Sequence, residues 1–185
     1  MQYDVVFSGF GGQGVLYAGQ LLAYAAMDHG LHVTWMPSYG PEMRGGTANC
    51  TVIVSDEDIG SPLVTHPTNV IALNNPSVDK YEPLVAQGGL LIYNASLTSR
   101  TLTRPDIRGI PIHASEAAAE LGNLRLLNMI MMGALLQLAD AIVPIEVVEI
   151  ALERHMATRH AELLALNRSA LRRGMALANF AGAVA

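Results

Sequence analysis

A glycine-rich hexapeptide near the start of the chain, residues 9–14 with the sequence Gly-Phe-Gly-Gly-Gln-Gly, most constrains the fold. It follows the apolar run 5–7 and precedes an alanine-rich stretch. Gly9, Gly11 and Gly14 fit the G-x-G-x-x-G pattern, in which a tight turn joins a β-strand to a helix. The N-terminus of such a helix can approach a diphosphate. Alternatively, the glycines only let the helix pack closely on the sheet.

The acidic residue that would complete a dinucleotide-binding turn is missing. Such a site has a carboxylate about 20 residues after the turn, at the end of the second strand, where it holds the ribose. Here Pro37, Ser38 and Tyr39 follow the second strand, and Glu42 comes only beyond two prolines and a glycine. We therefore disfavour a nicotinamide or flavin dinucleotide site. The turn is instead predicted to hold another anion or to contact a partner.

The composition indicates a chain that hides much of its surface. Charged residues make up 15% of the sequence and hydrophobic residues 51%, whereas about 25% of the residues of an average soluble domain are charged. A membrane span is disfavoured because the longest apolar stretch, residues 124–142, contains Arg125, Asn128, Gln137 and Asp140. The first residues lack the basic region of a signal peptide. We expect a cytoplasmic subunit of a larger assembly.

Charge and cysteine content exclude further classes of protein. The net charge is −5, and the positive side chains are ten arginines and Lys80, with no basic stripe beyond Arg168, Arg172 and Arg173. Nucleic-acid binding is therefore not expected. Cys50 is the single cysteine, which excludes an intrachain disulfide and an iron–sulfur cluster held by this chain alone. We predict that Cys50 is a buried structural thiol.

Short strands alternate with helices along most of the sequence. Strands are predicted at Tyr3–Ser8, His32–Met36, Ala48–Ser55, Val70–Leu73, Gly89–Tyr93 and Pro111–Ala114, and a break at Asn74–Pro76. Helices are predicted at Val15–His29, Val78–Ala86, Ser115–Leu121 (capped by Ser115), Leu124–Ala141, Ile145–Met156 and Ala161–Ala178. Several strands are wholly apolar, which is typical of a parallel sheet covered on both faces. We predict an α/β fold, a single domain over residues 1–185, with a mostly parallel sheet, helices on both faces, a Rossmann-like start and a helical C-terminal part.

Residues 128–136 are apolar on every helical face except for Asn128, so this helix is predicted to be buried all round. Its methionines are interpreted as packing residues. Asn128 is expected to form a hydrogen bond with a neighbouring loop. His155 and His160 are five residues apart, which is not the spacing of a helical metal pair, and no metal site is predicted.

Three segments together resemble a known family. They are residues 9–15, residues 128–135, and the loop 37–48 with the sequence Pro-Ser-Tyr-Gly-Pro-Glu-Met-Arg-Gly-Gly-Thr-Ala. In sequence and spacing they resemble the gamma subunit of 2-oxoacid:ferredoxin oxidoreductases, in the pyruvate/ketoisovalerate oxidoreductase catalytic-domain family. The 2-oxoglutarate and branched-chain 2-oxoacid enzymes are the most similar. The resemblance covers essentially the whole chain.

The resemblance implies a place in a multi-subunit oxidoreductase of anaerobic metabolism. Such complexes oxidatively decarboxylate a 2-oxoacid, here most closely 2-oxoglutarate, form an acyl-coenzyme A and reduce ferredoxin. Alpha and beta subunits hold thiamine diphosphate and Mg²⁺, and iron–sulfur clusters lie on beta or on a ferredoxin-like delta subunit. The gamma subunit is implied to be non-catalytic. We expect the isolated chain to be inactive, to bind none of these cofactors alone, and to form a homodimer because its apolar surface must be covered.

The resemblance also gives candidate site residues. We expect the turn and the loop 39–46 to lie at the carboxyl ends of neighbouring strands, where they touch coenzyme A, through its diphosphate, or an alpha or beta subunit. The candidates are Gly9, Gly11, Gly12, Gly14, Tyr39, Arg44, Gly45 and Gly46. The arginine suits bidentate contacts with phosphate or carboxylate, although an inter-subunit salt bridge is an equal alternative. Glu42 is interpreted as an ion-pair partner rather than a general base.

Two other interpretations stay open. The chain also resembles the small subunit of indolepyruvate:ferredoxin oxidoreductase, which has the glycine turn and a similar loop. In a different class, it could be a self-sufficient Rossmann-type enzyme that binds its own nucleotide.

Overall fold

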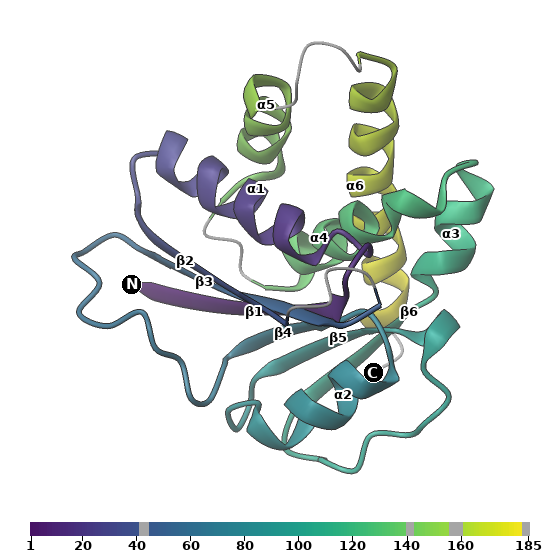
Figure 1. Cartoon of the computed structure of the whole chain (residues 1–185), viewed down its shortest axis with the longest axis horizontal. Coiled ribbons are helices and arrows are strands. Elements are labelled where there is room, and N and C mark those ends of the chain that lie inside the picture. Colours follow the sequence, from purple (N-terminus) through teal and green to yellow (C-terminus); the bar gives the residue numbers. More distant parts are fainter. Residues whose placement is uncertain (41–44, 140–142, 156–160, 183–185) are drawn as a thin grey trace.

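A six-stranded mixed sheet forms the centre of the molecule, with the strand order β2-β3-β1-β4-β5-β6 (Figure 1). In chain order the strands are β1 (Gln2–Phe10), β2 (His32–Tyr39), β3 (Thr47–Ser55), β4 (Asn69–Ala72), β5 (Leu90–Asn94) and β6 (Arg108–Ile112). Strand β3 is antiparallel to both of its neighbours, and the pairs β1–β4, β4–β5 and β5–β6 are parallel. This computed structural model describes residues 1–40, 45–139, 143–155 and 161–182.

Helices cover the two faces of the sheet unequally. One face carries α1 (Val15–Asp28), α3 (Ala114–Glu120), α4 (Leu127–Leu138), α5 (Ile145–His155) and α6 (Ala161–Gly182), which share one large apolar core (Figure 1). The other face carries α2 (Asn75–Tyr81) and the 3₁₀ turn Glu82–Leu84, over a smaller core. Alternate residues of β1 serve the two cores, since Val5 and Phe7 face the large one and Val6 the small one. The predicted α/β class, mostly parallel sheet and two-sided helical cover are confirmed.

Helix α4 is buried all round, as its composition predicts: every residue from Leu127 to Leu136 is buried. It crosses α6 at two glycines, Gly133 and Gly174. A Cβ atom on either glycine would overlap a backbone carbonyl oxygen of the opposite helix. Glycine therefore lets the two backbones approach to direct contact at this crossing.

The predicted end of the strand before Asn74–Pro76 is confirmed, since β4 ends at Ala72. Helix α2, however, begins at Asn75 rather than at the predicted Val78. The side-chain carbonyl of Asn74 accepts the N–H of Ser77 at 3.0 Å and caps the helix. Pro76 lies in the first turn, where its missing N–H costs no intrahelical bond. Asn and Pro often interrupt regular structure, but here Asn74 and Pro76 begin a helix.

Three other boundaries differ from the sequence-based expectation. Strand β2 continues through Pro37 to Tyr39, which is possible because β2 is an edge strand. Strand β6 starts at Arg108 and ends before His113. Ser115 does not cap α3; instead its hydroxyl accepts the Asn94 amide at 2.9 Å.

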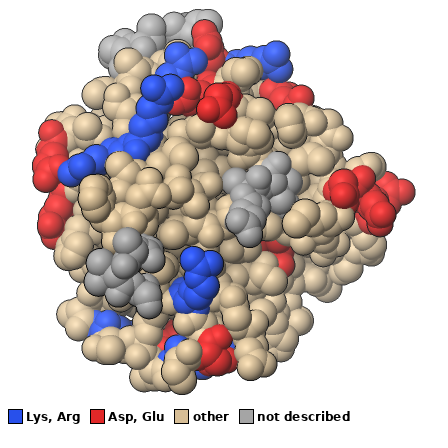
Figure 2. Space-filling model, turned by 180° about the vertical axis from the view of Figure 1, so that it is seen from behind, with Lys and Arg blue, Asp and Glu red and all other residues tan. Residues whose placement is uncertain are grey.

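The scarcity of charge is visible on the surface. Seen from behind, much of the described surface between a group of arginines and acids at the upper left and an acidic group at the right has no Lys, Arg, Asp or Glu (Figure 2). Within the residues that the structure describes, no helix is both long enough and apolar enough to cross a membrane.

Candidate functional site

The glycine turn connects the end of β1 at Phe10 to the start of α1 at Val15. Gly12 and Gly14 have φ angles of 99° and 75°, which favour glycine. Gly14 is the N-cap of α1, and no side chain caps the helix. A Cβ at Gly14 would also overlap the amide of Asn128, which donates a hydrogen bond to the Gly14 carbonyl at 3.1 Å. The predicted bond from Asn128 to a neighbouring loop is confirmed, and this loop is the turn itself.

Gly9 serves packing rather than turn geometry. A Cβ at Gly9 would lie 2.7 Å from Oε1 of Gln13 and 2.8 Å from a methyl group of Val15. The close-packing interpretation therefore applies at Gly9, which is buried. It does not apply at Gly12, where nothing lies within 4 Å of a Cβ position.

Polar side chains bond to one another across the crevice between β1 and β4. The helix that follows β1 lies on one face of the sheet, and the helix that follows β4 lies on the other. Open α/β sheets usually bind ligands at the crevice between two such strands. Oε1 of Gln13 accepts the Phe10 N–H at 2.7 Å and the Asn74 amide at 3.0 Å. The Ser77 hydroxyl donates to Oδ1 of Asn74 at 2.8 Å and accepts from Ser8 at 3.0 Å. This partly buried network lies at the place in the sheet where a Rossmann-type enzyme binds its nucleotide.

The β2–β3 hairpin lies on the other side of the turn. The Gly11 N–H donates to the Gly46 carbonyl at 2.8 Å, and the Gly45 N–H reaches the Gly11 carbonyl at 3.4 Å. The two segments that sequence reasoning selected are thus in direct contact. Their expected arrangement is corrected, because the loop runs from the end of β2 to the start of β3 and so joins antiparallel strands. Glu42 and Arg44 lie outside the described residues.

A cavity of about 550 Å³ opens between the turn, the first turn of α1 and the hairpin strands. It is lined by Phe10, Gly11, Gly12, Gly14, Val15, Leu16, Tyr17, Trp35, Pro37, Tyr39, Thr47 and Ala48. Four of the sequence-selected residues, Gly11, Gly12, Gly14 and Tyr39, are among them. Gly9, Gly45 and Gly46 support the turn and hairpin from outside this lining.

Sequence reasoning missed the apolar wall of this cavity. Trp35, Pro37 and Tyr39 share one face of β2 because side chains alternate along a strand. Extending the predicted strand past Pro37 would have placed these three residues together. Tyr17 follows the turn by three residues, and its position in the first turn of α1 was the available signal.

The described lining of the cavity contains no charged side chain. Its polar groups are the Thr47 hydroxyl, the tyrosine hydroxyls and backbone groups at the start of α1. An uncapped helix N-terminus presents N–H groups and a partial positive charge, which favour an anion. Burial raises the pKa of the Tyr17 hydroxyl, so this group stays neutral at physiological pH. The cavity combines apolar walls with one anion-favouring end.

Cys50 lies beneath this region and is fully buried, which confirms the predicted structural role. Its thiol packs against Gly19 of α1, where a Cβ would overlap the sulfur. Burial raises the pKa of the Cys50 thiol to about 12, although contacts with the Trp35 side chain and the Gly19 backbone oppose the shift. The thiol is therefore protonated and unreactive near neutral pH.

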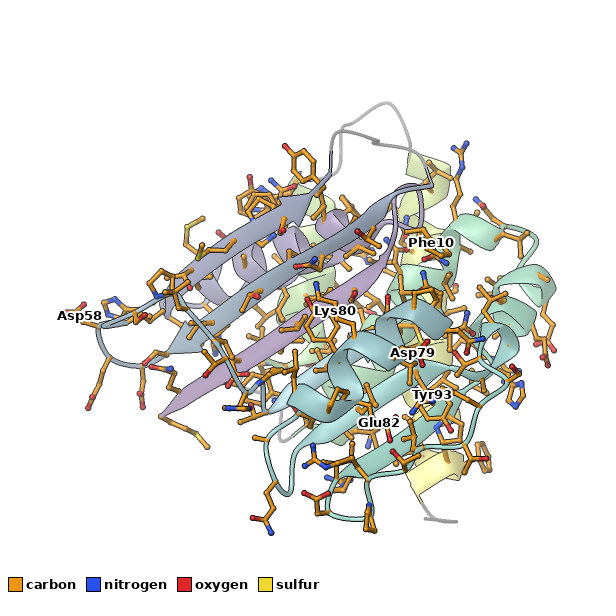
Figure 3. All side chains as sticks on the ribbon, turned by 60° about the horizontal axis from the view of Figure 1, so that its bottom comes forward. Phe10, Asp58, Asp79, Lys80, Glu82 and Tyr93 are labelled. Atoms are coloured by element: carbon orange, nitrogen blue, oxygen red, sulfur yellow. The ribbon has the colours of Figure 1, made fainter. Side chains whose placement is uncertain are left out.

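A second polar cluster lies on the α2 face, where Figure 3 shows Asp79, Glu82 and Tyr93 close together. Glu82 is 1% exposed, pairs with Arg100, and accepts the Thr103 hydroxyl at 3.0 Å. Burial raises the pKa of Glu82, but hydrogen bonds from Thr103 and from the Arg104 N–H, with the charge of Arg100, outweigh burial and lower it. This cluster fixes the loop after β5 and leaves no open site.

In the described parts of the chain, no three His, Cys, Asp or Glu side chains gather as metal ligands. His155 stacks on Tyr24 with ring centroids 4.1 Å apart and pairs with Asp28. His160 lies outside the described residues.

Fold and site together define an α/β protein of the doubly wound type, with polar side chains bonded across the β1–β4 crevice and an open cavity beside it. A family model described as pyruvate ferredoxin/flavodoxin oxidoreductase matches residues 4–177. The chain belongs to this family, and the predicted family is confirmed.

Two relatives show how the domain occurs in longer and shorter chains. Over 134 residues the chain is 42% identical to ketoisovalerate oxidoreductase subunit VorA of Methanothermobacter thermautotrophicus, an alignment that covers 72% of this chain and 28% of VorA. It is 33% identical over 145 residues to 2-oxoglutarate synthase subunit KorC of Methanocaldococcus jannaschii, covering 77% and 78% of the two chains. The chain thus spans little more than a quarter of VorA but most of KorC.

Two solved structures share the fold. The gamma subunit of keto/oxoacid ferredoxin oxidoreductase from Geobacter sulfurreducens matches with a TM-score of 0.84 and 29% identity, over 98% of both chains. The 2-oxoglutarate:ferredoxin oxidoreductase of Magnetococcus marinus matches with a TM-score of 0.88 and 24% identity, over 97% of this chain and 31% of that one. That structure contains 2-oxoglutarate, coenzyme A and succinyl-CoA.

Proposed function

We propose that this chain is the non-catalytic gamma subunit of a 2-oxoacid:ferredoxin oxidoreductase that decarboxylates a 2-oxoacid and forms an acyl-coenzyme A. The observation that carries the proposal is the open cavity at the uncapped start of α1, whose described lining has no charged side chain, beside a β1–β4 crevice bridged by polar side chains. A cavity with apolar walls and no charged side chain in its described lining is suited to assist other subunits rather than to carry redox chemistry.

The proposed substrate is 2-oxoglutarate. The similarity to KorC extends over most of both chains, which favours this choice over ketoisovalerate. Indolepyruvate is the second candidate, because the chain is 29% identical to indolepyruvate oxidoreductase subunit IorB of Archaeoglobus fulgidus over 94% of each chain. Substrate contacts are assigned to other subunits in this proposal.

The proposal assigns thiamine diphosphate, Mg²⁺ and the iron–sulfur clusters to alpha, beta and a ferredoxin-like delta subunit, in a cytoplasmic complex that reduces ferredoxin. The sequence has one cysteine, and the residues that the structure describes form no acidic cluster of the kind that a metal ion requires. In the absence of its partners, we expect it to form a homodimer.

The cavity suits the proposed contact with coenzyme A. The diphosphate of coenzyme A would lie at the N-terminus of α1, where Gly14, Val15 and Leu16 present backbone N–H groups. The aromatic walls at Tyr17 and Tyr39 would cover the less polar parts of the molecule. A segment of a catalytic subunit is the alternative occupant of the same cavity.

A matched pair of substitutions at Leu16, in the reconstituted complex, tests this contact. Leu16→Glu places a negative charge in the first turn of α1, which favours the helix but repels a diphosphate. Leu16→Gln has the same shape without the charge. We expect Glu to raise the KM for coenzyme A about tenfold relative to Gln, equivalent to about 1.4 kcal/mol, with kcat nearly unchanged. Equal KM values in fully assembled complexes would eliminate the coenzyme A contact.

The non-catalytic role is tested with the isolated chain. We expect no oxoacid-dependent reduction of ferredoxin, no binding of NAD or FAD in calorimetry, and co-purification with thiamine- and cluster-bearing subunits. Tight binding of either dinucleotide by the isolated chain would favour the Rossmann-type enzyme instead.

A further inference from the structure

We propose that two copies of this chain pair through β2, in an antiparallel arrangement that continues the sheet from one molecule into the next. This inference names the surface of the homodimer proposed above and does not depend on the redox assignment. Strand β2 is at the end of the sheet and pairs with β3 on one side only. In Figure 3 it is the outermost strand at the upper left, with its other edge uncovered.

The composition of β2 leaves this edge poorly protected. Proteins usually protect edge strands with charges, bulges, short length or a covering segment. Strand β2 has eight residues, none of them Lys, Arg, Asp or Glu, and its register with β3 is unbroken from His32 to Tyr39. Its one protective feature is Pro37. A regular, uncharged edge of this length is a template for another strand.

Pro37 decides where a second strand can pair. It has no N–H to give to β3, so the alternation of an antiparallel ladder directs the N–H groups of Val33 and Trp35 toward the free edge. Pairing centred on Thr34 sets Val33 opposite Trp35 of the second copy, and Trp35 opposite Val33. Pro37 then lies outside the paired residues, and every outward-facing group around Thr34 gains a partner.

The surface beside this part of β2 is apolar and incompletely filled. A cavity of about 280 Å³ lies between β2 and α1, lined by Gln20, Ala23, Tyr24, Met27, Val33 and Trp35. The Met27 side chain is 54% exposed at its rim. A second copy placed against β2 would cover this cavity and remove apolar surface from water, which stabilises the contact.

Charge favours a second copy over another partner. Across a two-fold axis, any charge on β2 would face or lie diagonal to its own twin, and like charges in that position destabilise a strand pair. The eight residues include no Lys, Arg, Asp or Glu, and their one histidine, His32, pairs with Asp58 of its own chain at 3.3 Å. This composition avoids the penalty and offers little for an oppositely charged partner to bind. The opposite edge strand, β6, differs in each respect, since it has five residues, begins with Arg108 and contains Pro111.

This contact leaves the proposed functional cavity accessible. The larger cavity meets β2 at Pro37 and Tyr39, whereas the pairing is centred on Thr34, nearer the start of the strand. Trp35 lies between the two and lines both cavities.

Light scattering and sedimentation of the isolated chain test the proposal. The wild type is expected to have a mass twice the 19.7 kDa of one chain, and to dissociate on dilution. Val33→Pro removes one outward N–H without taking a bond from β3, and it is expected to be monomeric at the same concentrations. The control Leu124→Lys changes another exposed side chain, far from β2 in the chain, and is expected to remain a dimer.

Two further measurements test the pairing even if the proline variant does not fold. Met27→Lys keeps the β2 backbone intact, puts a charge on the covered surface, and is expected to weaken the dimer about tenfold. Trp35 is the only tryptophan, so its emission is expected to shift to longer wavelength on dilution of the wild type, in step with the fall in mass.

The pairing would be overturned by a wild type that stays monomeric at its highest soluble concentration. It would also be overturned if the folded Val33→Pro and Met27→Lys variants both remain dimeric, or if the emission wavelength of Trp35 does not change when the dimer dissociates. Each differs from failure of the proposed function, which is measured by co-purification and by coenzyme A kinetics in the complex.

Discussion

Two regions of this molecule depend on glycine for opposite reasons. At the α4–α6 crossing, a Cβ on Gly133 or Gly174 would overlap a backbone carbonyl of the other helix. At the turn and hairpin, Gly12 and Gly45 have positive φ angles, and nothing lies within 4 Å of either Cβ position. The first region needs glycine because space is absent, and the second because of its backbone conformation.

These two uses of glycine distinguish a region that stabilises the fold from a region with open space for a ligand or partner. Where the interior is filled, as around α4, any added atom displaces a backbone. Where the turn leaves open space beside an uncapped helix, an added atom displaces only solvent, a ligand or a partner. We therefore expect substitutions of Gly133 or Gly174 to lower stability, and substitutions of Gly12 or Gly45 to alter binding more than stability.

The largest expected effect is at the helix crossing. Gly174→Ala or Gly133→Ala should lower the free energy of unfolding by about 3 kcal/mol, because rigid backbone must move to admit the methyl group. Chemical denaturation measures this loss. Gly60→Ala is the control, since it has open space and no positive φ, and a loss of similar size there would contradict the comparison.

The buried carboxylate of Glu82 gives a second example of a closely packed region, on the α2 face of the sheet. Glu82→Gln should cost about 2 kcal/mol at pH 7, because the charged hydrogen bonds and the pair with Arg100 are lost. The folded-state pKa of Glu82 is lowered, so its stabilisation is present above the unfolded pKa of about 4.3 and is lost as pH falls through the folded value.

Unfolding of both proteins across the acid range measures this dependence. The stability difference between wild type and Glu82→Gln should be constant above about pH 5 and should shrink below about pH 4. A difference that grows on acidification would mean that Glu82 is protonated in the folded protein.

A smaller effect is expected at the turn. Gly12→Ala should cost about 1 kcal/mol, because alanine resists the positive φ but meets no neighbouring atom. If the turn contacts coenzyme A, the KM of the assembled complex for coenzyme A should rise by more than the loss of about 1 kcal/mol in stability explains. Thermal unfolding and kinetics of the same preparation separate the two; a stability loss as large as that of Gly174→Ala would break the comparison.

The smallest effect concerns Cys50, whose reactivity in the folded protein should be very low. Because the thiol is fully buried and its pKa is raised to about 12, a thiol reagent at pH 8 should label it much more slowly in the folded protein than in the denatured protein. In the denatured protein the thiol is exposed and has its ordinary pKa, so a larger fraction is thiolate. Labelling of the folded protein as fast as that of the denatured protein would show that the thiol is accessible and ionised.

Much of the fold follows from local sequence. The all-apolar character of residues 128–136 is sufficient to predict that α4 is buried, and the glycine turn predicts the β1–α1 junction. The family was recognisable because the loop 37–48 has an unusual composition. Boundaries were less predictable: Asn74 and Pro76 have the same sequence signature in a loop as at a helix start, and only the position of β4 selects the helix.

The candidate site was predicted in part for a similar reason. Glycines mark a turn in sequence, so Gly11, Gly12 and Gly14 could be selected without coordinates, and so could Tyr39 in the hairpin. Trp35, Pro37 and Tyr17 were not selected, because the predicted second strand ended at Met36 and because the pairing of β2 with β3 and the packing of α1 bring these residues to one cavity. Arg44 stays a prediction.

The amino-acid sequence alone determined the strand–turn–helix start, the buried α4, the scarcity of charge and the absence of cluster ligands, because each depends on the chemistry of neighbouring residues. Only the tertiary structure decided that Gln13 bonds to Asn74 at the β1–β4 crevice and that the hairpin contacts the turn. Those outcomes depend on bonds between residues far apart in the chain, such as Gln13 to Asn74 and Gly11 to Gly46, and local sequence does not encode which distant groups will meet.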